Sequence, residues 1–489
     1  MPPRRTFVHR HPVDQHSSPS QLTRRNNVRR DRSTFLNDDE PSREPLQTTV
    51  LLRDLHSTSR QLSRLNSTMK LTKRLHRRLL PFSLVALCLT IPCFIPLCHA
   101  DEPAPQWWKG NIHTHSLWSD GDQFPEMIAD WYQSEGYNFL ALTDHNVLSE
   151  GSRWMDYSKI LQRSDDGILD RYRARFGNAW VETRGTEGEA DYQVRLKPLD
   201  EFRYLVEQHD QFILIPAEEI SDRGEGKPVH INATNLAEAL EPAGGDTVRQ
   251  VIENNLRAIL EHEKAHGREV LPHVNHPNFH YAVTAEDLAS VVSERFFEVY
   301  NGHPGVNHLG DDEHPSIERM WDIINALRQT SLNVPPMMGI ATDDSHEYHG
   351  KPGSRPGRGW VMVRSQYLTP EHLIRAMKRG DFYASSGVSL DDVKYDAESK
   401  TLSLQIQSDP ETTYQTKFIA TLAKADGLID EHRIGVTVAT SDSLQPQYTL
   451  TGKELYVRAV VTSSQPARDP SFKDQKQQAW TQPVGWESP

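Results

Sequence analysis

The segment GNIHTHSLWSDG at residues 110–121 contains three side chains that are able to bind a metal ion. His113 and His115 are two residues apart, and Asp120 follows five residues later. Side chains at positions i and i+2 of a β-strand point to the same face, so a strand over residues 111–115 would direct both imidazoles to one side. Two imidazoles suit zinc, manganese or iron. A His-x-His pair also occurs on ordinary exposed strands, so the metal interpretation depends on the rest of the chain.

Further His, Asp and Glu residues accompany short apolar segments along the chain. These segments are predicted strands at 138–143, 212–216, 229–232, 270–277, 296–303 and 336–341. The polar residues in or directly after them are Asp144, His145, Glu218, Glu219, His230, His273, His276, Asn301, His303, Asp343, Asp344 and His346. In parallel βα barrels the C-terminal ends of the strands face the active site. We therefore expect these side chains to gather at one end of a sheet.

Amphipathic segments between the predicted strands favour helices at 124–134, 199–208, 247–266 and 317–329. A strand, a helix and a strand in succession are typical of a parallel βαβ unit. The region 105–388 has a suitable size for a βα barrel that carries insertions. Residues 152–210 are charged and lack sustained periodicity, and we expect them to be an insertion that covers the site or shapes access to it.

The pattern changes after residue 388. Alternation of apolar and polar residues at 402–406, 434–438 and 455–460, with turn residues between these segments, predicts antiparallel strands. We interpret 389–489 as a small antiparallel β domain, a sandwich, without a catalytic cluster of its own. A docking role and a purely stabilising role both fit this domain.

The charge of the chain is unevenly distributed. Of its 54 Lys and Arg and 67 Asp and Glu residues, 37 and 60 respectively fall in 101–489, which gives this part a net charge of −23. Such an acidic body argues against binding to a nucleic-acid polymer. It does not exclude a small anionic substrate, because metal ions reverse the local charge of a site.

The first hundred residues have the pattern of an export signal. A basic run at 70–78 precedes an apolar stretch at 79–97 that closes on Ala100, which predicts a signal peptide over 69–100 and an exported mature protein. Met69 would then be the initiator, and the polar residues 1–68 would be disordered or not part of the protein. A membrane anchor is the alternative, but Pro81, Pro92 and Pro96 weaken it as a spanning helix. All three cysteines lie within 88–98, so a metal in the mature chain would be held by His, Asp and Glu.

The motifs HTHSLWSDG, LTDHN, PAEEIS with VHI, NHPN and ATDDSH occur in this order between residues 112 and 346. They resemble the ordered motifs of the PHP (polymerase and histidinol phosphatase) superfamily of metal-dependent phosphoesterases. The resemblance implies a distorted (β/α)7 TIM-like barrel over 101–388 and a cluster of two or three divalent metal ions, zinc, manganese or iron. By matched position, the metal ligands would be His113, His115, Glu219 and Asp344 for one ion, Glu219, His230 and His276 for a second, and Asp120, His145 and His346 for a third.

Three of these assignments involve a choice between neighbours. Glu219 is preferred to Glu218 because it directly precedes Ile-Ser as in the family motif, and adjacent strand residues face opposite ways. His276 is preferred to His273 because the family histidine is followed by Pro. Asp344 is preferred to Asp343 because the family spacing is Asp-x-His.

The resemblance implies hydrolysis of a phosphate ester by a metal-bridging hydroxide, with Asp344 as both ligand and proton acceptor. A small phosphorylated substrate is expected, with Arg358 or Arg355 near its oxygens and Asn301 and His303 lining the pocket. A metal-dependent amide hydrolase would use the same nucleophile on carbon. A non-catalytic exported protein that binds metal or another ligand is the third possibility.

Overall fold

A computed structural model describes residues 102–423 and 430–486 of the protein. The expected signal peptide and the 1–68 extension lie outside the described residues. Among the residues that are described, no helix has the length and apolar character needed to cross a membrane.

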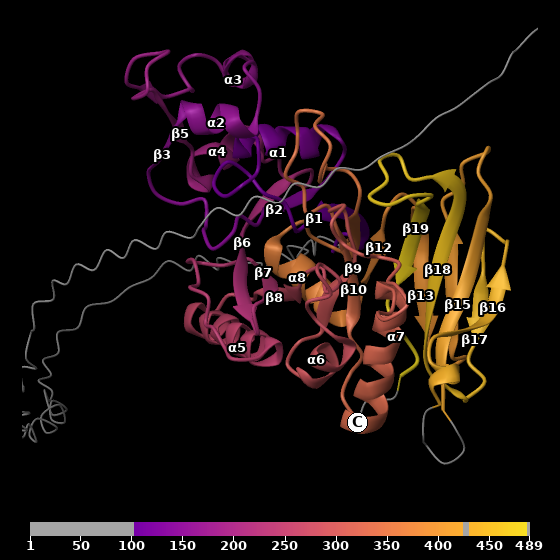
Figure 1. The fold of residues 1–489 in the computed structure, drawn as a ribbon. Helices are drawn as coiled ribbons and strands as arrows, with labels where there is room; N and C mark the ends of the chain where they lie inside the picture. The colour runs from indigo at the N-terminus through magenta and orange to yellow at the C-terminus, as the bar shows by residue number, and fades with distance from the viewer. Residues whose placement is uncertain (1–101, 424–429, 487–489) are drawn as a thin grey trace, which may run out of the picture. The chain divides into compact units, whose positions relative to one another are not determined.

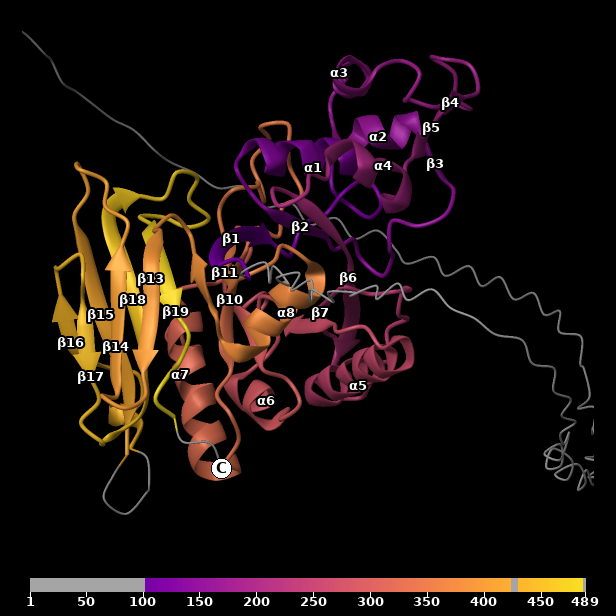
Figure 2. The ribbon, with the colours of Figure 1, turned by 180° about the vertical axis from the view of Figure 1, so that it is seen from behind.

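A mixed sheet of thirteen strands runs through the described chain in the order β10-β9-β8-β7-β6-β2-β1-β11-β12-β19-β18-β15-β16 (Figures 1 and 2). Strands β1, β2 and β6 are parallel to one another, as are β8, β9 and β10. Strand β7 is antiparallel to both β6 and β8. The first nine strands of this order are β1 (Gln106–Asn111), β2 (Phe139–Leu142), β6 (Ile213–Gly224), β7 (Lys227–Thr234), β8 (Leu271–Val274), β9 (Phe296–Asn301), β10 (Met338–Thr342), β11 (Trp360–Ser365) and β12 (Phe382–Ser385).

The sheet is not closed by strand pairing, so the predicted closed barrel is not confirmed. Strand β10 is the end of the strand order and forms a ladder with β9. A single bridge between Thr114 and Ser345 links the segments that follow β1 and β10. Strands β6 and β7 form a hairpin across Glu225 and Gly226, which both have positive φ, so this step has no helical crossover. The structure is therefore α/β with a large mixed sheet.

Five helices accompany the first nine strands of the sheet. Their bounds are α1 (Pro125–Ser134), α5 (Val248–His266), α6 (Ala285–Ser290), α7 (Ile317–Leu327) and α8 (Pro370–Arg379). Helix α5 starts with a capping box between Thr247 and Gln250 and ends at Gly267, whose φ of +59° suits glycine. The helices predicted at 124–134, 247–266 and 317–329 agree with α1, α5 and α7 to within two residues, and a π-helical turn (Arg328–Leu332) follows α7.

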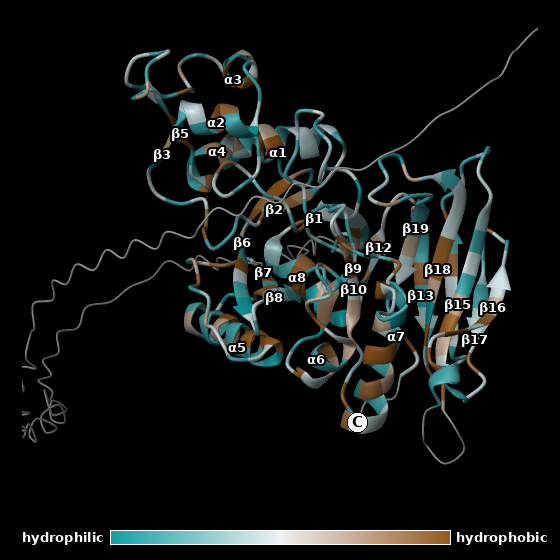
Figure 3. Cartoon of the chain, viewed as in Figure 1, coloured by the Kyte–Doolittle hydropathy of each residue, from teal (hydrophilic) through white to brown (hydrophobic). Residues whose placement is uncertain are grey.

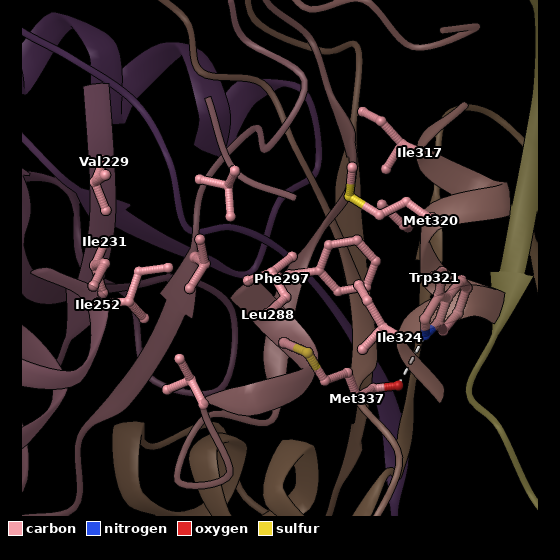
Figure 4. Packing of buried hydrophobic residues seen from close by; sticks show 14 of the residues in the cluster. Val229, Ile231, Ile252, Leu288, Phe297, Ile317, Met320, Trp321, Ile324 and Met337 are labelled. Carbon is pink, nitrogen blue, oxygen red and sulfur yellow. Dashed lines mark hydrogen bonds between the residues drawn. The ribbon is translucent and has the colours of Figure 1, made fainter. Parts of the chain in front are cut away.

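The largest apolar core lies between β7–β10 and helices α5, α6 and α7. Figure 4 shows Ile231, Ile252, Phe297 and Trp321 within it, and Trp321 Nε1 donates to the carbonyl oxygen of Met337 at 2.8 Å. Strand β2 is apolar along its whole length and buried on both faces (Figure 3). Such a strand fits the middle of a sheet that is covered on both sides.

The predicted insertion has more regular structure than its sequence suggests. It contains a three-stranded sheet in the order β3-β5-β4 and three helices. Its elements are β3 (Arg153–Asp156), α2 (Tyr157–Arg163), α3 (Ile168–Phe176), β4 (Thr183–Arg184), β5 (Gln193–Leu196) and α4 (Leu199–Val206). Its apolar cluster includes Leu117 and Trp118, so the insertion is packed directly on the segment between His115 and Asp120.

The C-terminal residues form antiparallel strands in two sheets with an apolar layer that both share. The strands are β13 (Leu390–Asp396), β14 (Thr401–Ile406), β15 (Tyr414–Leu422), β16 (Val436–Ser441), β17 (Gln447–Thr449), β18 (Glu454–Pro466) and β19 (Lys476–Thr481), and a short 3-10 turn (Glu431–Arg433) precedes β16. Strand β19 pairs with β12, so the large sheet continues without a break across the boundary predicted at residue 388.

Candidate metal centre

His113 and His115 lie just beyond β1 rather than inside it. The strand ends at Asn111, which corrects the strand predicted over 111–115. The backbone stays fixed because His115 N donates to the carbonyl oxygen of Ser345 at 2.9 Å and Asn111 Oδ1 accepts from His113 N at 3.0 Å. The two imidazole rings are 5.2 Å apart between centroids. The spacing of two residues thus correctly predicts that His113 and His115 point to the same side, although β1 has already ended at Asn111.

The two imidazoles face two buried carboxylates and form an inner group. Asp344 Oδ1 lies 3.2 Å from His113 Nε2 and 3.2 Å from His115 Nε2. Glu219 Oε1 and Oε2 lie 3.4 Å from the same two nitrogens, respectively. Both histidines are 0% exposed, Glu219 is 1% and Asp344 is 5% exposed. These side chains come from segments more than a hundred residues apart in the sequence.

A second group shares Glu219 with the inner one. Glu219 Oε1 is 3.1 Å from His230 Nδ1 and 3.5 Å from His276 Nε2. Glu219 therefore lies between two sets of imidazoles, as a bridging ligand would. His276 and Asp344 have φ values of +23° and +47°, in the left-handed region that non-glycine residues rarely adopt. Backbone strain of this kind is common at functional sites.

A third, outer group opens to solvent. Asp120 Oδ1 is 3.4 Å from His346 Nε2, and Asp120 Oδ2 is 3.5 Å from His145 Nε2. The Asp120 side chain is 52% exposed and that of His145 28% exposed, so this side is the mouth of the cluster. Asp144 shapes the turn that carries Asp120, because it accepts hydrogen bonds from Ser116 and from Ser119 Oγ.

The arrangement of the atoms fits metal binding. His113 Nε2, His115 Nε2 and Glu219 Oε2 are buried and make no hydrogen bond with any described residue. Leaving such atoms unpaired inside a protein costs free energy. Two ligands of a tetrahedral zinc ion, each ~2.1 Å from it, are about 3.4 Å apart, close to the separations of 3.2 to 3.4 Å in the inner group. The donor set of imidazole and carboxylate also suits divalent metal ions.

The charges of the cluster favour ionised carboxylates. Burial raises the pKa of Glu219, but His145, His230 and His113 outweigh it and hold that pKa well below its ordinary value. The same balance of burial against neighbouring imidazoles lowers the pKa of Asp344. Burial, with His346 beside it, lowers the pKa of His115 to about 4, which keeps this imidazole neutral and able to bind a metal.

Glu218, Asp343 and His273, the three residues that the family motifs do not select, each have another partner in the structure. Glu218 Oε1 accepts from Leu240 N at 2.6 Å, on the face of β6 opposite Glu219. Asp343 accepts from the backbone of residues 357–359, including Arg358 N at 2.6 Å, and so holds the loop after His346. His273 lies behind the inner group, 3.5 Å from a carboxylate oxygen of Glu298.

Three of the four residues expected to bind substrate, Arg358, Arg355 and Asn301, have partners within the protein. Arg358 is buried and donates to the carbonyl oxygens of Gly302 and Gly353 and to Asp469 Oδ2. Arg355 also pairs with Asp469. Asn301 is fully buried, and its amide donates to Asp344 Oδ2 at 3.1 Å, so it supports the cluster from inside. His303, the fourth candidate, lies near the mouth with its ring centroid 5.9 Å from that of His346.

Sequence reasoning missed Glu298. It lies on β9, is 0% exposed, and its Oε1 is 2.7 Å from His113 Nδ1. Its sequence context could have indicated it, because Glu298 is the only charged residue in the apolar segment FFEVY. A carboxylate on a buried strand is rarely left without a partner, so a nearby polar or cationic group was to be expected.

Comparisons with known proteins give limited similarity. No family model matches the sequence. A segment of 70 residues is 30% identical to the DNA polymerase/3'-5' exonuclease PolX of Bacillus subtilis (strain 168), and it covers 14% of this chain and 12% of that protein. The chain therefore matches only about an eighth of the length of this relative.

Two solved structures are similar to parts of the chain. One is a two-domain Bacteroides vulgatus protein containing a predicted PHP-like metal-dependent phosphoesterase, with 16% identity, a TM-score of 0.34 and coverage of 78% of this chain and 96% of that one. The other is a Bifidobacterium adolescentis protein described as a candidate metal-dependent phosphoesterase, with 14% identity, a TM-score of 0.27 and coverage of 56% and 98%.

Proposed function

We propose that this protein is a metal-dependent phosphoesterase of the PHP superfamily. The observation that carries the proposal is the convergence of nine His, Asp and Glu side chains from the five ordered motifs. These residues are His113, His115, Asp120, His145, Glu219, His230, His276, Asp344 and His346. Two or three divalent ions, zinc, manganese or iron, would be held by these groups, with Glu219 between the inner and the second. When bound, such ions lower the pKa of water and neutralise phosphoryl oxygens.

The chain's own residues would contribute orientation, charge and a proton acceptor. Asn301 donates to Asp344 Oδ2, so this carboxylate is fixed while its Oδ1 faces His113 and His115. As an ionised carboxylate, Asp344 is able to accept a proton from attacking water. The exposed side at Asp120 and His145 is where a small phosphorylated substrate would enter. The net charge of −23 over 101–489 disfavours a nucleic-acid polymer as substrate.

Metal-loaded protein is expected to hydrolyse phosphate esters and to lose this activity when a chelator removes the metal. The measurement compares 4-nitrophenyl phosphate, bis(4-nitrophenyl) phosphate and 4-nitroacetanilide, before and after chelation and after return of zinc, manganese or iron. Faster turnover of the anilide would favour the amide hydrolase. Full metal occupancy without turnover of any of the three would favour a non-catalytic binding protein.

We also propose that the protein is exported through the signal at 69–100. The order of basic, apolar and small residues supports this. Cells expressing the chain from Met69 are expected to release a protein that starts at Asp101, which N-terminal sequencing of the secreted or periplasmic fraction checks. A purified native protein that retains residues 1–68 would contradict the proposal.

A further inference from the structure

Glu298 is a buried carboxylate at the centre of a hydrogen-bond network beneath the metal centre. Its Oε1 lies 2.7 Å from His113 Nδ1 and accepts from Thr342 Oγ1 at 2.6 Å. Its Oε2 accepts from His276 N at 2.7 Å and from Asn301 Nδ2 at 2.8 Å. Both oxygens are therefore saturated. Two of the four partners, His113 and His276, are candidate metal ligands, and a third, Asn301, donates to the candidate ligand Asp344.

The contact with His113 determines which imidazole nitrogen is free. An ionised carboxylate only accepts hydrogen bonds, so Nδ1 of His113 must carry the proton. In the neutral ring Nε2 then has the lone pair, and Nε2 is the atom that points at Glu219 and Asp344. A hydrogen bond of this kind fixes the tautomer and orientation of a metal-binding histidine.

The other oxygen of Glu298 acts on the second group and on Asp344. It holds the backbone N–H of His276, a residue whose φ of +23° is unfavourable without such support. It also orients Asn301, whose amide nitrogen reaches Asp344 Oδ2 at 3.1 Å. One carboxylate thus connects His113, His276 and Asp344.

We infer that Glu298 is a positioning residue that presets the inner and second metal positions together, by fixing the tautomer of His113 and the backbone of His276. The inference rests on the proposed metal centre. It assigns to Glu298 no contact with metal or substrate.

Replacement Glu298→Gln tests this assignment sharply. Glutamine has one accepting oxygen, and His276 N–H and Asn301 Nδ2 are obligate donors, so the amide oxygen should face them. The amide NH2 would then face His113 and donate a hydrogen bond to it, which His113 can accept only at an unprotonated Nδ1. The neutral ring would carry its proton on Nε2, the nitrogen that must bind the metal. We expect the affinity for zinc to fall about 10- to 100-fold, the range for loss of a carboxylate that orients a metal ligand.

Glu294→Gln is the matched control. Glu294 is also a buried glutamate close to β9, but it accepts hydrogen bonds from the backbone of Arg295 and Phe296, and within the described part of the chain it forms no hydrogen bond or ion pair with the cluster. Zinc affinity is measured by competition with a chelator on each full-length protein, after circular dichroism shows that the metal-free forms are folded. In the zinc-loaded wild type, 15N-histidine NMR should find His113 protonated at Nδ1 and hydrogen-bonded.

The outcomes separate the two proposals. Wild-type protein that takes up no zinc, manganese or iron would remove the metal centre and the proposed function. Wild type that binds zinc, with Glu298→Gln matching Glu294→Gln in affinity, would overturn the role of Glu298 and leave the proposed function intact. A proton on Nε2 of His113 in the zinc-loaded wild type would also overturn it.

Discussion

Glu219→Gln is expected to lower kcat/KM for phosphoester hydrolysis by about 10³-fold and to reduce the bound metal. Glu219 lies within 3.5 Å of imidazole nitrogens of both the inner and the second group. Glutamine keeps the shape of the side chain but removes the charge that would offset two divalent ions. A loss of several kcal/mol in stabilisation of the transition state corresponds to this factor. Elemental analysis and steady-state kinetics under one metal condition make the measurement.

Glu218→Gln is the control for this prediction, because it is the same change one residue away. Glu218 faces the opposite side of β6, where it accepts from Leu240 N. Its replacement is expected to leave metal content and kcat/KM within about twofold of wild type, since surrounding contacts are retained. Equal losses for the two variants would mean that both carboxylates serve the site. A larger loss for Glu218→Gln would reverse the assignment.

Glu218→Gln is also expected to change how the free energy of unfolding depends on pH. Burial raises the pKa of Glu218 from 4.5 to about 7, with the hydrogen bond from Leu240 acting in the opposite direction. A raised folded pKa means that the charged form is penalised in the folded protein, so the wild type loses stability as the pH rises from about 4.5 to about 7. The free energy of unfolding of Glu218→Gln relative to wild type should therefore grow by about 3 kcal/mol across this window and stay constant above it. Urea unfolding at several pH values measures it.

Asp322→Asn is expected to lower the free energy of unfolding by about 3 to 5 kcal/mol. Asp322 on α7 pairs with Arg458 on β18 through two contacts, Nε to Oδ1 at 2.9 Å and Nη2 to Oδ2 at 2.7 Å, and also accepts from Tyr456 OH at 2.7 Å. Arg458 is 1% exposed and also lies over the ring of Trp321. Asparagine would leave a buried guanidinium with only the more distant and partly exposed Glu318 carboxylate at 3.8 Å, and loss of the close partner costs far more than the pair itself contributes.

This pair joins the C-terminal strands to α7, so its loss should be visible in urea unfolding followed by tryptophan fluorescence. Asp381→Asn is the control, since Asp381 pairs with Arg379 on the surface and such exposed pairs contribute about 1 kcal/mol or less. The double change Asp322→Leu with Arg458→Met should recover most of the stability, because it removes both charges together. A loss below about 1 kcal/mol for Asp322→Asn would show that the pair is not important for folding.

Much of the local structure follows from the sequence. Helices α1, α5 and α7 were predictable from apolar periodicity and from Thr247 and Gly267 at the ends of α5, because these are interactions within a few residues. Strand alternation predicts that Glu218 and Glu219 face opposite ways, and the structure has them so. The resemblance to the family motifs selected Asp344 by its Asp-x-His spacing and His276 by the proline that follows it, and both side chains face the cluster in the structure.

The length of strand β6 was not predictable from local sequence patterns. The sequence predicts a strand that ends at Pro216, but β6 continues to Gly224 because it forms a ladder with β7. Hydrogen bonds between strands, rather than the polar sequence AEEISDRG, extend it. The same hairpin places β7 antiparallel in the sheet, which the expectation of regular βα units did not include.

The sequence by itself therefore determined the side-chain types of the candidate site and the order along the chain of the segments that carry them. Only the tertiary structure decided which partner each polar group has. Glu298 meets His113 across 185 positions of the chain, and Arg358 meets Asp469 across 111. The sequence does not distinguish a buried carboxylate from an exposed one, and an arginine within the glycine-rich segment 353–359 does not reveal which acid it will bind. These pairings depend on packing over long sequence separations, where each buried charge must find a partner that the fold brings to it.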